Sequence, residues 1–236
     1  MAVAYIASLF LVVVAFFIVR LVTILPIFRT YEKQSHVRQT QALLNKYKNF
    51  GGQLHVFVFL GSGGHTGELL IILKNYKNIL LSSGNTIHVG YSDVDSYNKF
   101  KELAKSYDCK VKYYRFVKAR EVGASKLTSI KSILMTLIKS FGYVFEIRQA
   151  MKNTPHLVLF NGPGTCCILA LWFKLLELIF PFSSSSNIVY IESLARINSL
   201  SLTGKVLYWI ADEFIVQWEE LKEKLGDRVK YFGILV

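Results

Sequence analysis

The chain has 236 residues, of which 52% are apolar and 19% charged, so it has enough apolar surface to bury a core and is not intrinsically disordered. With 4 Pro, 15 Gly, 3 Cys and no repeat, it is neither a collagen-like protein nor a disulfide framework. Its 28 Lys and Arg against 16 Asp and Glu leave a net charge of +12 with neutral histidines, and the mean hydropathy of +0.35 indicates a membrane segment.

The first 28 residues form an apolar N-terminal segment. No charged side chain occurs from Met1 to Val19, and a second uncharged run follows Arg20. About 20 apolar residues at ~1.5 Å rise each cross a bilayer core of ~30 Å. A cleaved signal peptide would have basic residues before its apolar core, whereas here they follow it. We therefore predict an uncleaved transmembrane anchor over 1–28, with a lumenal N-terminus and a cytosolic body by the positive-inside rule.

Residues 29–53 are polar and basic and end in two glycines. We predict a juxtamembrane linker with a short helix around 39–48, whose positive charge suits an anionic cytosolic leaflet. The three cysteines, Cys109, Cys166 and Cys167, lack the C-x-x-C spacing of a metal or redox site. We interpret them as buried apolar residues.

From residue 54 onward, short β-branched and aromatic runs alternate with amphipathic stretches. The predicted strands are 54–60, 86–91, 110–116, 156–161, 187–192 and 213–218. The predicted helices are 66–81, 94–107, 125–151, 164–180 and 203–211, with a short charged helix before the apolar end. Strands alternating with helices predict a Rossmann-like α/β domain over 54–236, with a parallel sheet covered on both faces. Its functional residues are expected after the first, fourth and fifth strands.

The first of these loops is GSGGHTGE, residues 61–68. Glycines at a helix N-terminus let backbone N–H groups approach an anion, so a phosphate or diphosphate is the expected guest and a tight structural turn is the alternative. The loop is not a P-loop, and Thr66 interrupts a dinucleotide fingerprint whose acidic partner, Asp93, is only loosely placed. His65 suits acid–base chemistry near neutral pH, or caps the helix.

Two later loops complete the expected site. Asn161-Gly162-Pro163-Gly164-Thr165 follows the fourth strand and forms either a second anion site or a rigid turn into a helix near Thr165. Glu192 and Ser193 follow the fifth strand. The Glu192 carboxylate either faces the cleft or pairs with Arg196 four residues on.

Six stretches carry a resemblance to a known family: VFLGSGGHTGE (58–68), KAREV (118–122), FNGPGTCC (160–167), YIESLARI (190–197), SLTGK (201–205) and the ending FIVQW…YFGILV. With the anchor, they make the chain similar to the membrane-anchored subunit of the two-subunit N-acetylglucosaminyltransferase of the dolichol pathway. That enzyme adds the second N-acetylglucosamine to dolichyl-diphospho-N-acetylglucosamine. More distantly, the chain resembles the acceptor-binding half of bacterial lipid-linked N-acetylglucosaminyltransferases of peptidoglycan synthesis.

The resemblance implies half an enzyme at the endoplasmic reticulum membrane. After the anchor, the chain has length for only one of the two Rossmann-like domains of such a transferase, so we expect the donor, UDP-N-acetylglucosamine, to bind mainly to a soluble catalytic partner that carries the donor-binding domain. The expected reaction is an inverting β-1,4 transfer to the dolichyl-diphosphate acceptor. We expect no cofactor, no metal and no nucleic acid, but contact with membrane lipid.

By the resemblance and the loop chemistry, His65 is the first candidate for the catalytic base. Glu192 is the second, or else it orients His65 or binds a sugar hydroxyl. The residues expected to hold the acceptor diphosphate are Gly61, Ser62, Gly63, Gly64, Thr66, Asn161, Gly162, Gly164 and Thr165. The apolar end is expected to dock within the domain or on the partner, and its residues are Phe232, Gly233, Ile234, Leu235 and Val236.

Two predicted helices are apolar enough either to cover the sheet or to lie at the membrane surface. Helix 125–151 has cationic side chains at Lys126, Lys131, Lys139 and Arg148, whereas 165–180 has only Lys174 and Glu177 as charges. Two rival functions remain. A non-catalytic membrane scaffold fits the anchor and the apolar end, and a nucleotide-cofactor oxidoreductase fits less well because the glycine fingerprint is imperfect.

Overall fold

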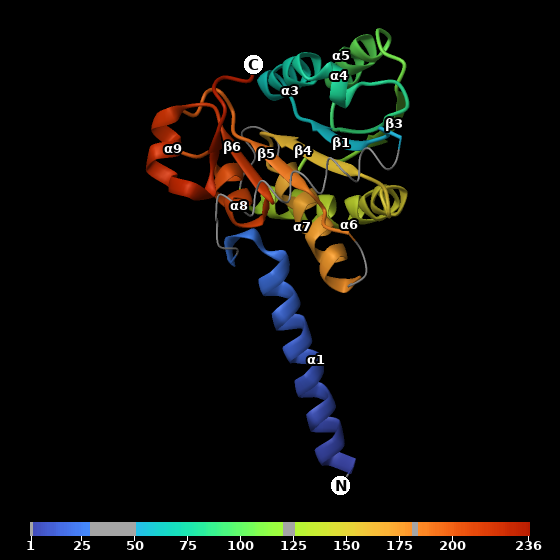
Figure 1. Ribbon diagram of the computed structural model, residues 1–236, viewed down its shortest axis with the longest axis vertical. Coiled ribbons are helices and arrows are strands. Elements are labelled where there is room, and N and C mark those ends of the chain that lie inside the picture. The colour runs from blue at the N-terminus through green and yellow to red at the C-terminus, as the bar shows by residue number, and fades with distance from the viewer. Residues whose placement is uncertain (1, 29–50, 120–125, 181–183) are drawn as a thin grey trace.

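The structure is a computed structural model that describes residues 2–28, 51–119, 126–180 and 184–236 (Figure 1). It begins with helix α1 (Ala2–Ile24), followed by the 3-10 helix η1 (Pro26–Phe28). α1 stands away from an α/β domain and, within the described ranges, is the one helix long and apolar enough to cross a membrane. The short helix predicted around 39–48 lies outside the described residues, as do most of the predicted linker and part of the KAREV stretch.

The domain is built on one seven-stranded parallel sheet with the order β3-β2-β1-β4-β5-β6-β7. Its strands are β1 (His55–Leu60), β2 (Thr86–Tyr91), β3 (Lys110–Arg115), β4 (His156–Asn161), β5 (Ile188–Ile191), β6 (Glu213–Val216) and β7 (Lys230–Tyr231). The strand order reverses between β1 and β4, which places a crevice at the carboxyl ends of these strands. The Rossmann-like parallel fold is thus confirmed, with β7 as a short addition that the sequence did not predict.

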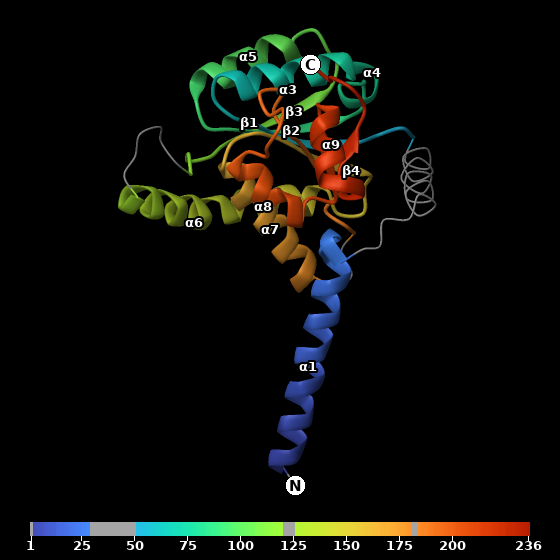
Figure 2. The ribbon, with the colours of Figure 1, turned by 90° about the vertical axis from the view of Figure 1, so that its left-hand side faces the viewer.

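Helices cover the two faces of the sheet (Figure 2). On one face lie α3 (Gly64–Asn75), α4 (Lys77–Leu80) and α5 (Val94–Ala104), and on the other lie α6 (Lys126–Ala150), α7 (Thr165–Ile179) and α8 (Leu202–Ile210). The chain then forms α9 (Glu219–Leu225) and the 3-10 helix η2 (Gly226–Arg228). The helix predicted over 66–81 is two helices, because the backbone of Tyr76 (φ −104°, ψ 25°) departs from helical angles between them.

The central strand β1 explains why its sequence is a continuous apolar run. Val56 to Leu60 are all fully buried, and alternate side chains enter different apolar clusters. Phe57 and Phe59 pack with residues of α6 and α7, whereas Val56, Val58 and Leu60 pack with residues of α3. Full burial of one such side chain contributes about 1.5–3 kcal/mol, so both helical layers are held to the same strand.

α7 covers the sheet, and nine of its residues are buried, including both of its charged side chains. Lys174 Nζ lies 3.2 Å from Glu177 Oε2 and 2.8 Å from Asp212 Oδ1. The two carboxylates also accept backbone N–H groups, Glu177 from Ser186 at 3.1 Å and Asp212 from Ile188 at 2.9 Å. The charges of α7 therefore hold β5 and the start of β6 in place.

Arg148 was predicted together with the other cations of α6 as a side chain at the sheet or the membrane surface. It is instead buried in the domain. It is 6% exposed, lies 3.1 Å from His156 Nε2 through Nη1, and donates to the backbone oxygen of Ser184. The reason is its place in the last turn of α6, where the helix packs on the segment before β5 and the carbonyl groups there need donors.

We predict that Lys174→Met destabilises the protein by roughly 3–5 kcal/mol, because two buried carboxylates lose their counter-charge. The measurement is the free energy of unfolding from urea denaturation of the detergent-purified chain, followed by tryptophan fluorescence. The matched control is Lys105→Met, which breaks an exposed pair with Glu102 and should cost at most about 1 kcal/mol. Equal losses in the two variants would contradict the prediction.

Candidate functional site

The loop after β1 presents free backbone N–H groups. Ser62, Gly63 and Gly64 are exposed, and α3 begins at Gly64 with no side-chain cap. Gly63 has a φ of 60°, in the left-handed region that favours glycine. The first N–H groups of α3 have no partner within the helix, so they are available to an anion.

The loop after β1 and the turn after β4 pack directly against each other. A Cβ built on Gly61 would lie 2.9 Å from Cγ of Pro163, and one built on Gly162 would overlap the His65 ring. Gly162 also has a φ of 100°, which other residues rarely adopt. Glycine is therefore required at both positions, and the His65 imidazole lies against the turn after β4, as expected if these loops form one site.

Two buried polar atoms at this junction have no hydrogen-bond partner among the described residues: Nδ1 of His65 and Oδ1 of Asn161. His65 itself is half-buried, and Asn161 is fully buried. A buried polar atom left unpaired costs about 1–3 kcal/mol. Such atoms are rare in folded proteins and require an explanation, and a bound ligand or an ordered water would supply one.

Glu192 lies at the carboxyl end of β5 but does not reach His65. Its carboxylate is 1% exposed. Oε1 accepts from the Tyr190 hydroxyl at 3.2 Å and the Ser193 N–H at 3.0 Å, while Oε2 accepts from Ser201 N–H and Oγ at 3.0 and 3.1 Å. Arg196 is exposed and is not among these partners. These contacts hold the segment 193–201 against β5.

Two neighbours reinforce the environment of Glu192. A Cβ on Gly204 would overlap the carboxylate, so the start of α8 approaches it directly. Burial, and then the nearby Glu192 charge, raise the pKa of Tyr190 far above its ordinary value. Tyr190 thus keeps its proton and remains a hydrogen-bond donor to Glu192.

Glu68 links the loops of the candidate site, a role that was not predicted from the sequence. From the first turns of α3, its carboxylate accepts from Asn161 Nδ2 at 3.0 Å, Ser193 Oγ at 2.8 Å and Leu194 N–H at 3.4 Å. One side chain therefore ties the loop after β1 to the loops after β4 and β5. Glu68 lies three residues after His65 on the same helix, and this spacing could have indicated that the two side chains are neighbours. Its distant partners, Asn161 and Ser193, are set by the fold and could not be predicted from that spacing.

The hydroxyl groups of the two threonines in the expected diphosphate set are engaged by the protein. Thr66 Oγ1 donates to Gly61 O at 2.7 Å, and Ser96 Oγ donates to the same oxygen at 2.6 Å. Asp93 caps α5 by accepting from Ser96 N–H at 2.9 Å. Thr165 Oγ1 accepts from Ala119 N–H at 3.2 Å. These side chains shape the loops, and residues 62–64 remain exposed.

The cysteines are free thiols, but only Cys166 is buried as predicted, whereas Cys109 and Cys167 are half-buried. Burial raises the pKa of Cys166 well above its ordinary value and that of Cys167 to about 11. Both thiols therefore stay protonated at the start of α7. In the described part of the chain, no group of three or more His, Cys, Asp and Glu side chains is arranged to hold a metal ion.

The C-terminal tail divides into docked and exposed residues. Leu235 is 8% exposed, its N–H donates to Gln217 Oε1 at 3.0 Å, and its carbonyl accepts from Asn75 Nδ2 at 3.1 Å. Phe232 and Ile234 are 65% and 54% exposed. Beside the tail lies an apolar groove of about 260 Å³, lined by Ile72, Tyr76, Ile79, Leu80, Leu157, Leu159, Val189, Ile191, Ile215, Phe232 and Leu235.

Comparison with known proteins gives concordant matches. The family model described as "Oligosaccharide biosynthesis protein Alg14 like" matches residues 56–235. A Saccharomyces cerevisiae protein named UDP-N-acetylglucosamine transferase subunit ALG14 is 51% identical over 238 residues, covering 100% of both chains. The protein of that name from Candida glabrata is 47% identical, over 99% of this chain and 98% of its own. Among solved structures, Acinetobacter baumannii MurG is 14% identical with a TM-score of 0.45, over 70% of this chain and 41% of that one.

We predict that Glu68→Ala lowers the free energy of unfolding by about 1–3 kcal/mol, since it leaves partners on two other loops without their acceptor. Hydrogen exchange should localise the effect, with faster exchange of the Leu194 amide. The exposed Glu223 provides the matched control, and Glu223→Ala should alter neither quantity. An unchanged Leu194 amide in Glu68→Ala would argue against the three-loop link.

Proposed function

Because the chain belongs to the Alg14-like family of oligosaccharide biosynthesis proteins, whose curated members are named as subunits of a UDP-N-acetylglucosamine transferase, we propose that it supplies the acceptor half of that enzyme. The proposed reaction adds the second N-acetylglucosamine, in a β-1,4 linkage, to dolichyl-diphospho-N-acetylglucosamine. The observation that carries the proposal is the junction of the loops after β1 and β4. There, the exposed residues 62–64 lie beside His65 and Asn161, each of which has a buried polar atom with no hydrogen-bond partner among the described residues.

In the proposed chemistry, the acceptor 4-hydroxyl attacks the anomeric carbon of the donor sugar, the bond from that carbon to UDP breaks, and the configuration inverts. A neutral hydroxyl is a weak nucleophile, so its proton must pass to a base. His65 is the better candidate because its ring is half-buried at the loop junction, whereas every oxygen of Glu192 is already hydrogen-bonded. We assign the acceptor diphosphate to the backbone of 62–64 and of the turn after β4.

The donor half of the cleft is proposed to come from a partner chain. The described residues form a single sheet with a single set of carboxyl-end loops, and those loops suit the acceptor. UDP-N-acetylglucosamine would then bind mainly to a soluble catalytic subunit, and neither a cofactor nor a metal ion is invoked. α1 would hold the complex at the endoplasmic reticulum membrane, with its N-terminus lumenal and the domain on the cytosolic face.

We predict that His65→Ala, co-purified with the partner, loses about 10²–10⁴-fold in turnover, the usual contribution of a general base. The measurement is transfer of radiolabelled N-acetylglucosamine to a dolichyl-diphospho-N-acetylglucosamine acceptor. His55, at the opposite end of β1, is the control, and His55→Gln should retain activity.

Full turnover by His65→Ala would show that His65 is not the catalytic base. The rival scaffold function makes a different prediction, because recruitment alone would suffice. In that case, the soluble partner fused to an unrelated transmembrane helix would make product without this domain. Failure of that fusion, together with loss of activity in His65→Ala, supports an acceptor-binding role.

We also predict that the exposed part of the tail binds the partner. Phe232→Ser combined with Ile234→Ser should reduce co-purification of the partner, because two large exposed apolar side chains are removed, and Phe232 is one that lines the apolar groove. Leu202→Ser, an equally exposed apolar position on α8, is the control. If the double variant co-purifies with the partner as well as the unchanged chain does, the tail has a role in local packing and does not bind the partner.

A further inference from the structure

The first half of α6 has its polar and apolar sides reversed relative to a helix that covers a sheet. The side chains that face the domain in its first half are small and polar, and Ser129, Thr136 and Ser140 are 9%, 1% and 2% exposed. Thr136 Oγ1 donates to Ser132 O at 2.8 Å and Ser140 Oγ donates to Leu137 O at 3.1 Å. The half-buried Ser132 donates to Ala119 O, in the segment after β3, at 2.8 Å. The apolar side of this half is therefore not the side that packs on the domain.

The outward side of α6 carries a continuous apolar stripe. Its members recur at three- to four-residue spacing, which places them on one helical face. They are Ile130, Ile133, Leu134, Ile138, Phe141 and Phe145, with exposed fractions between 37% and 71%. Single exposed apolar residues are ordinary, but a stripe of this length marks an interaction surface.

The stripe continues onto the end of α7. Phe141 packs on Trp172 with ring centres 4.8 Å apart, and Trp172 Nε1 donates to the Leu137 carbonyl at 2.9 Å. Phe145 lies 6.4 Å from Phe180, which is 45% exposed at the end of α7. The exposed apolar surface of α6 is thus joined to the part of α7 against which α1 rests.

α1 is fixed to the domain at that place. Arg20 Nη2 donates to the Glu177 carbonyl at 2.6 Å, in the last turn of α7, where a cation is also favoured by the helix dipole. Ile24 is 4% exposed, and Pro26 is buried where η1 contacts α8. These contacts therefore fix the direction in which α1 extends from the domain.

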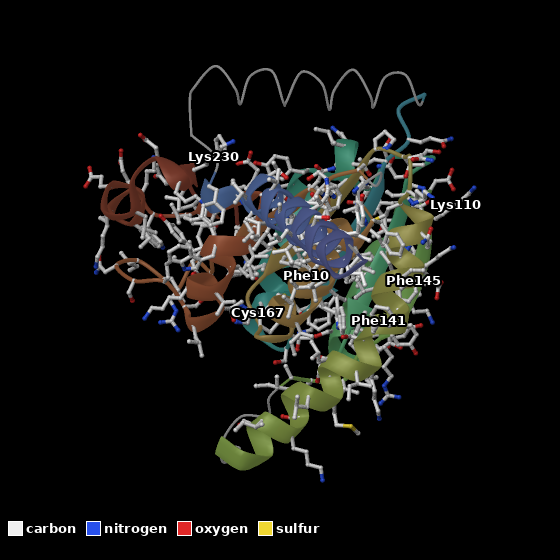
Figure 3. All side chains as sticks on the ribbon, turned by 90° about the horizontal axis from the view of Figure 1, so that it is seen from below. Phe10, Lys110, Phe141, Phe145, Cys167 and Lys230 are labelled. Carbon is white, nitrogen blue, oxygen red and sulfur yellow. The ribbon has the colours of Figure 1, made fainter. Side chains whose placement is uncertain are left out.

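α6 lies across the direction of α1 and on the face of the domain from which α1 leaves (Figures 2 and 3). In the view along α1, the whole length of α6 is exposed to the viewer, and Phe141 and Phe145 lie on that face. α6 therefore lies across α1 near the domain end of α1. An interfacial helix has this orientation relative to a spanning one.

We propose that α6 lies in the interface of the cytosolic leaflet with its apolar stripe inserted between lipids, as a second membrane contact beside α1. The occupant is lipid because the stripe is continuous with the base of the apolar anchor. The charge also fits, since Lys131 and Lys139 are exposed on α6 and Arg115 lines a small cavity with Lys139. Cations beside an apolar face suit an anionic leaflet. The proposal rests on membrane anchoring by α1, which is part of the proposed function.

The test uses the full chain in phosphatidylcholine–phosphatidylserine vesicles, with one nitroxide label at a time. Labels at Leu134→Cys and Ile138→Cys should be accessible to oxygen, which concentrates in the bilayer, and shielded from a water-soluble nickel chelate. Glu102→Cys, exposed on α5 across the sheet, is the control that should remain open to the chelate. Phe10→Cys reports on α1 separately.

A lipid-protected label at Phe10 with chelate-accessible labels at Leu134 and Ile138 would overturn the proposal and leave the anchor intact. A chelate-accessible label at Phe10 would instead defeat the anchor and, with it, the proposal. Protection of the α6 labels that appears only when the soluble partner is added would assign the stripe to a protein interface and would also overturn it. Protection by vesicles alone supports the lipid contact.

Discussion

The contact between the loop after β1 and the turn after β4 is the constraint on which the site depends. β1 and β4 are neighbours in parallel register from His55 opposite His156, so their carboxyl ends lie at the same edge of the sheet. The His65 ring can rest there only because Gly162 has no side chain. Glu68 then fixes both loops to the segment after β5 through hydrogen bonds to Asn161 and Ser193. The exposed amides keep their arrangement without help from a ligand.

Much of the fold could be predicted from the sequence because strands buried on both faces are continuous apolar runs, and 86–91 and 156–161 were predicted with their observed bounds. The three loops could be located because parallel strands end at one edge. Side-chain partners could not be predicted in the same way. Glu192 satisfies Ser201, nine residues on, and Arg148 donates to a carbonyl before β5. Both partners are set by tertiary packing, which cannot be predicted from the spacing of residues along the chain.

The polar residues of the site divide into those that build it and those left available. Thr66, Ser96 and Thr165 use their hydroxyls on backbone groups, so the loops keep their shape. The atoms left over are the His65 and Asn161 pair and the amides of the glycine-rich loop. A site whose free groups are mostly backbone donors is suited to a diphosphate, and the His65 imidazole beside it is of a side-chain type that serves in proton transfer.

The two proposed membrane contacts bear on how such a site would meet a lipid-linked substrate. A domain held by one helix is free to rotate about that helix and to tilt, so its loops would sample many heights above the headgroups. The Arg20 contact with the end of α7 restricts tilt, and a second contact along α6, which runs across the direction of α1, would restrict rotation. α6 is the next helix along the chain after β3, whose carboxyl end lies at the edge that carries the site. Inserting the first half of α6 would therefore fix the orientation of this edge, and of the glycine-rich loop on it, relative to the lipid surface, where a diphosphate on a long polyprenyl chain must remain.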